Sequence, residues 1–194
     1  MKYNSKTVAL VLVMMALALI SRASAKTDTI FPYQQQYGSG WDDSASKHNG
    51  DIRWVSGQSS PWILYVRGWC DFDLRSLRPN QPSNYRRIIL HYYEFSDTNN
   101  PSAKLMWCGY ARPLTQPAGV LWNNLAGNFW LGTKTGGIQW HVDTLPGWAT
   151  WPMNPALDSE LVIGWLEPAS GSIAKVGWAY GWTSANPPFL EFEP

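Results

Sequence analysis

Tryptophan dominates the chemically informative residues of this sequence. The chain carries 13 Trp among 194 residues, which is more than a core of this size encloses easily, so some rings are expected at the surface. A sugar presents apolar C–H faces and a rim of hydroxyl groups, which flat aromatic rings beside amide groups complement. Two segments combine Trp with Asn or with bounding prolines. The predicted ligand-binding residues are Trp122, Asn123, Asn124, Trp130, Trp148 and Trp151.

Groups suited to catalysis form no recognisable motif. The sequence lacks Cys-x-x-Cys, His-Glu-x-x-His, Gly-x-Ser-x-Gly and a phosphate-binding glycine loop. His141 and Asp143 share a strand face and could bind a metal or shuttle a proton. The carboxylates from which a glycosidase pair could be chosen follow no telling spacing, and they are Asp71, Asp73, Glu94, Asp143 and Glu167. We therefore predict no catalytic residues.

An acidic segment near the N-terminus is the only candidate for a hard cation. Asp42, Asp43 and Asp51, with Asn49 between them, offer the oxygen ligands that calcium prefers. Their spacing matches no defined calcium loop, so no metal site is predicted, and a structural calcium stays an open alternative. No cofactor is predicted.

The first 25 residues have the features of a secretory signal peptide. Lys2 and Lys6 precede an apolar run over residues 8–20, which is too short to span a bilayer, and Ala23-Ser24-Ala25 supplies a cleavage site. The mature chain is then a single domain over residues 26–194, and we expect it to be secreted and extracellular, with the periplasm or cell surface as alternatives. Removing the signal peptide takes the formal net charge from +1 to about −2, which argues against nucleic acid as a partner.

Two cysteines remain in this exported chain. Oxidising compartments favour disulfides, and Cys70 falls on the apolar face of a predicted strand, so we predict a bond between Cys70 and Cys108. Two buried free thiols are the alternative.

The pattern of apolar residues indicates an all-β fold. Gly, Pro, Asn and Ser interrupt the chain every 8 to 15 residues, and helical periodicity is absent. We predict a jelly-roll-like β-sandwich of two antiparallel sheets, without a helix longer than about two turns. On the strand around residue 70, the face with Trp69 and Asp71 is expected to be the wetter one. The predicted strands are 51–55, 62–74, 87–95, 104–110, 138–145, 160–167, 173–181 and 189–192.

Five segments in chain order resemble the DNRLRE-type jelly-roll modules, relatives of the TGF-β-propeptide-like fold. They are 67–77 (RGWCDFDLRSL, similar to a phrase FDLSSL), 89–93 (ILHYY), a loop at 120–124 (VLWNN), 142–144 (VDT) followed by Trp148, and 184–192. The resemblance spans residues 41 to 194. It implies a non-catalytic sandwich of secreted or surface proteins, in some members a polysaccharide-binding module.

Together these observations predict a secreted, non-catalytic module that binds a glycan or extracellular matrix polymer through exposed Trp, with no membrane span. A polysaccharide lyase or glycoside hydrolase is one alternative. A structural surface or matrix protein whose Trp faces pack against neighbouring copies is the other.

Overall fold

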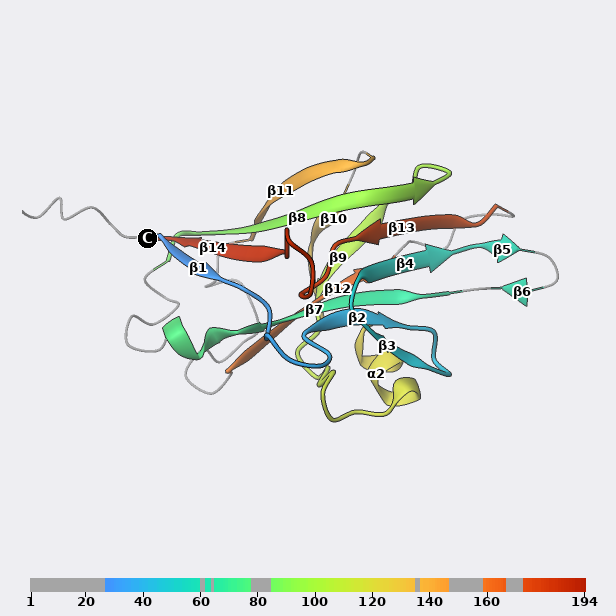
Figure 1. The fold of residues 1–194 in the computed structure, drawn as a ribbon, viewed down its shortest axis with the longest axis horizontal. Helices are drawn as coiled ribbons and strands as arrows, with labels where there is room; N and C mark the ends of the chain where they lie inside the picture. The colour runs from blue at the N-terminus through green and yellow to red at the C-terminus, as the bar shows by residue number, and fades with distance from the viewer. Residues whose placement is uncertain are drawn as a thin grey trace, which may run out of the picture.

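Two antiparallel sheets packed face to face form the protein. The computed structural model describes residues 27–59, 62–63, 65–77, 85–134, 137–146, 159–166 and 173–194. The predicted all-β sandwich is confirmed, since each of the two main sheets has six strands and all of their pairings are antiparallel (Figure 1). The predicted signal peptide, residues 1–25, lies outside the described residues. Within the described ranges no helix is long and apolar enough to cross a membrane.

The first sheet is built around one long strand, β8 (Arg87–Thr98). On one side β8 pairs with β11 (Gln139–Leu145), and on the other it pairs with β14 (Phe189–Glu193) along its first half and β13 (Lys175–Ala179) along its second half. β1 (Asp28–Ile30) extends the sheet beside β14, and β4 (Ile52–Ser56) extends it beside β13.

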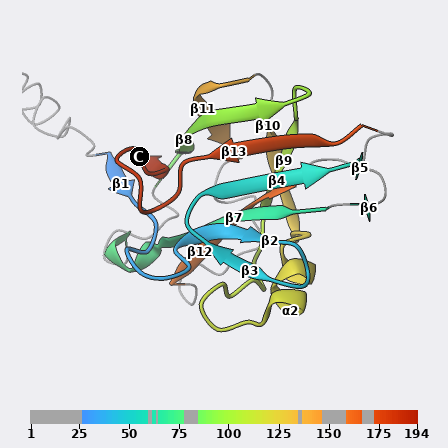
Figure 2. The ribbon, with the colours of Figure 1, turned by 45° about the vertical axis from the view of Figure 1, so that its right-hand side comes forward.

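The second sheet follows the order β10-β9-β12-β7-β2-β3. Its strands are β10 (Phe129–Lys134), β9 (Ala103–Trp107), β12 (Glu160–Leu166), β7 (Arg67–Asp73), β2 (Ser39–Asp42) and β3 (Lys47–Asn49). The two sheets meet where Val55 and Val66 exchange backbone hydrogen bonds of 3.0 and 2.9 Å, so β4 and β7 run side by side (Figure 2). A short pair, β5 (Gln58–Ser59) and β6 (Trp62–Ile63), lies beyond this end of β4 and β7, and a 3-10 turn, η1 (Leu74–Leu77), follows the opposite end of β7 (Figure 1).

The main core fills the space between the sheets. Alternate residues of each strand point inward, as the period of two requires. Trp54 and Trp165 are fully buried there, and the Trp54 indole occupies the space that a side chain at Gly177 would need. Trp54 and Trp165 are therefore core residues and cannot contact a ligand at the surface.

A second, smaller core covers the outer face of the second sheet. The helix α2 (Ala118–Asn124) lies over this face, and Leu121 and Leu125 pack there with Trp69, Cys108 and Val162 (Figure 2). The prediction of a wetter face here is wrong, because α2 and its flanking segment exclude water from it. The helix has seven residues, which is consistent with the predicted limit of about two turns.

The predicted disulfide is wrong. Cys70 and Cys108 are both buried and both free. Cys70 belongs to the core between the sheets, whereas Cys108 belongs to the smaller core beneath α2. The second sheet separates the two thiols. β12 runs beside both cysteines, because Ile163 pairs with Cys70 and the Val162 carbonyl accepts a hydrogen bond from the Cys108 amide.

Candidate functional site

The Trp-Asn-Asn segment lies in a helix and not in the expected loop. Trp122 is half-buried, and the Arg67 guanidinium lies 3.5 Å from the centroid of its ring. The Trp122 carbonyl accepts a short hydrogen bond from Arg67 Nη1. Asn124 donates to the Tyr110 carbonyl at 3.1 Å, while Asn123 is exposed. The contact of Trp122 with Arg67 therefore holds the helix against β7, and Asn124 joins the helix to the segment that follows β9.

Of the two predicted rings that the structure describes, Trp122 and Trp130, the second is the more exposed. It lies on β10 with 59% of its surface accessible, and its Nε1 donates to the Gly132 carbonyl at 2.8 Å. It pairs with Met106, which packs against the smaller core, so Trp130 and Trp122 lie on the same side of the second sheet. Trp148 and Trp151 lie outside the described residues.

Among the residues that the structure describes, the largest collection of accessible aromatic rings lies elsewhere, on the outer face of the first sheet. The strand register shows this: Trp140 is opposite Tyr93, Phe189 is opposite His91, and each of the four lies next to a buried residue along its strand. β2 and β3 extend this surface beyond β4. We call this surface the aromatic face, and it consists of Phe31, Trp41, His48, His91, Tyr93, Phe95, Trp140, Trp178, Tyr180 and Phe189.

Two runs of touching rings make up the aromatic face. In the short run, the Phe31 ring centroid is 5.8 Å from that of Phe189, which stacks on His91 at 4.2 Å. In the long run, successive centroids are 3.5 to 6.4 Å apart, in the order Trp140, Tyr93, Tyr180, Phe95, Trp178, Trp41 and His48.

Polar groups accompany both runs. Arg53 lies 5.1 Å from the Trp41 ring centroid and 4.8 Å from that of Trp178. His91 forms a 2.9 Å contact with Glu191. The face therefore offers hydrogen-bonding groups between its rings, as a hydroxylated ligand requires.

Accessibility differs along this surface. Most of its rings are half-buried because they stack against one another. Phe31 is 48% exposed and Trp140 is 45% exposed, and Val142, next to Trp140 on the same face of β11, is 60% exposed. Phe31 and Trp140 are therefore the two rings best able to contact a ligand with a flat surface.

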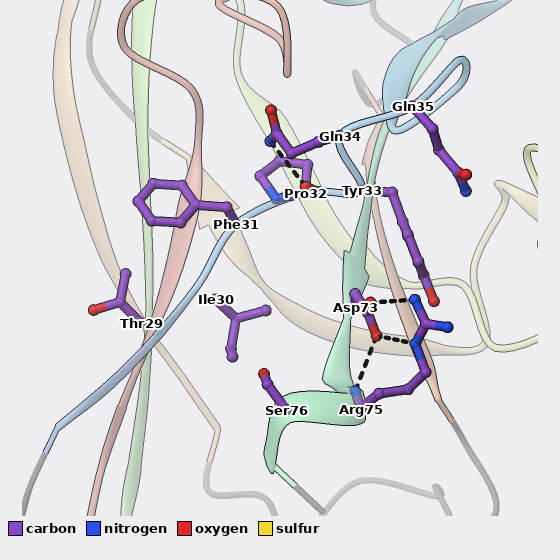
Figure 3. A pocket seen from close by; sticks show the side chains of 10 residues that line it. All are labelled: Thr29, Ile30, Phe31, Pro32, Tyr33, Gln34, Gln35, Asp73, Arg75 and Ser76. Carbon is purple, nitrogen blue, oxygen red and sulfur yellow. Dashed lines mark hydrogen bonds and ion pairs between the residues drawn. The ribbon is translucent and has the colours of Figure 1, made fainter.

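A hollow of about 410 Å³ adjoins the aromatic face at Phe31. It forms where the N-terminal segment crosses from the first sheet to the second, fixed by a 2.9 Å hydrogen bond from the Tyr33 amide to the Asp71 carbonyl. Phe31 lies on one side of this segment, and Tyr33, Asp73 and Arg75 gather on the other (Figure 3). The lining residues are Thr29, Ile30, Phe31, Pro32, Tyr33, Gln34, Gln35, Asp73, Arg75 and Ser76.

Neighbouring groups determine the protonation states of Asp73 and Tyr33 in the hollow. Arg75 Nε donates to Asp73 Oδ1 at 2.8 Å, and this hydrogen bonding lowers the pKa of Asp73. Burial, followed by nearby carboxylates, raises the pKa of Tyr33 to about 12. Asp73 thus stays ionised and Tyr33 stays a neutral phenol, so the hollow offers both donors and acceptors next to an exposed ring.

The carboxylates considered for catalysis are mostly shielded. Glu94 is fully buried and contacts Lys134 at 2.6 Å and His141 at 3.0 Å. Asp71 is also buried, which raises its pKa well above the ordinary value. Asp73 is half-buried, and its carboxylate is hydrogen-bonded to Arg75. Glu167 lies outside the described residues.

The oxygens of the calcium candidates serve as acceptors for backbone N–H groups. Asp42 Oδ1 accepts from Ser44, Asp43 Oδ1 accepts from Ala45 and Ser46, and Asp51 Oδ1 accepts from Gly181. Asn49 Oδ1 accepts from the Tyr37 amide and Trp182 Nε1. In the described part of the chain no group of three or more His, Cys, Asp or Glu is arranged to hold a metal ion. A structural calcium ion, which the sequence left as an alternative, stays an open alternative.

Sequence reasoning missed the aromatic face, although one signal for it was present. In β8, His91, Tyr93 and Phe95 alternate with Leu90, Tyr92 and Glu94, so the outward rings could be recognised on that strand alone. Their partners come from five other strands and from Phe31, and only the pairing order brings them together.

No protein-family model matches the chain, and a search of curated proteins finds no match. The resemblance to DNRLRE-type modules therefore stays a prediction.

Proposed function

We propose that this protein is a secreted, non-catalytic module that binds a polysaccharide along the aromatic face of its first sheet. The observation that supports this most strongly is the aromatic face itself, ten rings on one side of the molecule, with Phe31 and Trp140 nearly half exposed. Exposed apolar patches of this kind usually mark binding surfaces. The hollow beside Phe31 supplies phenol, amide, carboxylate and guanidinium groups for the hydroxyl rim of a sugar.

Retention by polysaccharides tests the proposal. The mature chain is run through native gels containing soluble polysaccharides and incubated with insoluble cellulose and chitin. We expect retention by at least one of them. Trp140→Ala and Phe31→Ala should each weaken it about tenfold, because covering one ring contributes on the order of 1–2 kcal/mol. The melting temperature should hardly change, since both side chains are at the surface.

Trp130→Ala is the matched control, because this ring is 59% exposed but lies on the second sheet. One outcome would contradict the proposal: Trp130→Ala or the double variant Trp148→Ala/Trp151→Ala weakens binding, and Trp140→Ala does not. The binding site would then be the set of residues predicted from sequence, and not the aromatic face. Release of soluble oligosaccharides would instead identify a lyase or hydrolase.

A structural role is the second candidate, and β11 favours it. In the described residues β11 pairs with β8 alone, so its other edge is open. This edge strand carries Trp140 and Val142, both exposed on its outer face. Open apolar edges promote pairing between copies. Self-association without retention by any polysaccharide would support that role.

A further inference from the structure

A lysine and a glutamate meet inside the sandwich, one from each sheet. Lys134 ends β10 in the second sheet, and Glu94 lies on β8 in the first. Both side chains have no accessible surface, and Lys134 Nζ is 2.6 Å from Glu94 Oε2. Neither residue belongs to the aromatic face or the hollow, so the pair is independent of the proposed function.

Aromatic rings lie close to this pair, and one further carboxyl group, Asp143, interacts electrostatically with Lys134 and His141. Lys134 Nζ lies 5.4 Å from the Trp54 ring centroid and donates to the Pro101 carbonyl at 3.0 Å. Tyr92 stacks on His141 with a centroid distance of 4.8 Å. Burying two ionised groups in such surroundings is costly unless their hydrogen bonds are complete.

The hydrogen bonds of Glu94 are incomplete. Its Oε2 is shared by Lys134 and His141, whereas its Oε1 is buried without a partner among the described residues. An amide would remove both charges and leave a neutral oxygen in that position, which is cheaper to bury than a carboxylate.

We propose that Lys134 and Glu94 form a covalent isopeptide bond that joins the two sheets. The proton between Nζ and Oε2 passes to the carboxylate, which leaves a neutral amine facing a neutral carboxyl group. The nitrogen lone pair attacks Cδ, an N–C bond forms, and Oε2 departs as water with a second proton from the same nitrogen. The reaction joins an ammonium and a carboxylate into one amide and one water, with no oxidant or other reactant.

The surroundings assist each step. Holding the two groups in contact removes the entropic cost of bringing them together. A desolvated lysine is a better nucleophile than a solvated one. His141 Nε2, 3.0 Å from Oε2, hydrogen-bonds the oxygen that leaves. The exclusion of bulk water disfavours hydrolysis of the product.

Mass measurement of the purified chain under denaturing conditions tests the proposal. We expect a mass lower than that of the sequence by one water molecule, with the N-terminus fixed by its terminal peptide. A protease digest should contain one branched peptide that links the segments around Glu94 and Lys134. An ion pair alone would leave the mass unchanged.

Amine labelling of the unfolded chain gives a second measurement. Lys134 should resist acetylation after complete denaturation, whereas Lys47 should react fully. Lys47 is the matched control, because within the described part of the chain its Nζ donates to two backbone carbonyls, those of Pro113 and Gln116, at 2.6 and 2.9 Å. In Glu94→Leu the full mass should return and Lys134 should react, whether or not this variant folds. Full mass and complete acetylation of Lys134 in the wild-type chain would overturn the proposal, and so would a branched peptide at any other pair.

Discussion

Buried carboxyl groups are the most unusual feature at the scale of single residues. Asp42, Asp71 and Asp143 each have one oxygen that is buried without a hydrogen-bond partner in the described part of the chain. In all three, burial is the main cause of a raised pKa. Their ionised forms therefore oppose folding, and the stability of the protein should depend on pH through them.

Asp42 gives the clearest test, because burial raises its pKa to about 6. A folded-state pKa above the unfolded value means that folding favours the protonated form. The ionised carboxyl costs stability above pH 6, and that cost disappears as the pH falls toward 4. Asp42→Asn keeps an acceptor for the Ser44 amide and removes the charge. It should stabilise the protein by about 1–3 kcal/mol at pH 7.5 and by little at pH 4.

Urea unfolding of both proteins across this pH range measures the difference. Asp43→Asn is the control, because Asp43 is in the same turn and only half-buried. A gain for Asp42→Asn that is equal at pH 4 and pH 7.5 would show that the charge of Asp42 is not its cause.

Which single residues are exposed could be predicted only in part. The excess of Trp correctly indicated surface rings, since Trp130 and Trp140 are exposed, yet Trp54, Trp69 and Trp165 are fully buried. Composition alone cannot separate these two groups, because burial of a ring depends on which strands pair beside it.

At the scale of elements, strands were far easier to predict than the helix. Each of the eight predicted strands has a counterpart, because alternation and turn residues mark them. The Trp-Asn-Asn segment was expected in a loop, and the structure places it in α2. Its N-cap position is Pro117, without a side-chain cap. Contacts of Leu121 and Leu125 with the second sheet stabilise it, and these contacts leave no local signal.

α2 should therefore behave as part of the core. Leu121 is fully buried against the smaller core, whereas Val120, its neighbour in the helix, is 48% exposed. Leu121→Ala should destabilise the protein by about 2–4 kcal/mol, the usual cost of removing a buried leucine side chain. Val120→Ala should change the stability by less than about 0.5 kcal/mol. Denaturant midpoints measure both, and equal midpoints would mean that α2 is not docked.

At the scale of the whole molecule, the two borders of the sandwich differ. On one border β4 and β7 are joined through Val55 and Val66. On the other, β11 is the last strand of the first sheet within the described ranges, and it carries the exposed Trp140 and Val142. Such an edge can accept another strand.

We expect weak, concentration-dependent self-association through this border. Val142→Lys should abolish it, because a charge on an edge strand opposes pairing between copies. Val120→Lys, on the distant α2, is the control and should leave association unchanged. Sedimentation velocity over a range of concentrations measures all three proteins, and a wild-type chain that is monomeric at every concentration would contradict the expectation.

The two free cysteines lie in different cores. The rate at which each thiol reacts therefore reports how often its own core opens. Burial raises the pKa of Cys108 to about 12 and that of Cys70 well above its ordinary value, so a thiol reagent must wait for an opening. Lifting α2 is enough to uncover Cys108, whereas Cys70 is uncovered only when the sheets part. The two labelling rates therefore time local opening and global unfolding separately, in an unmodified chain.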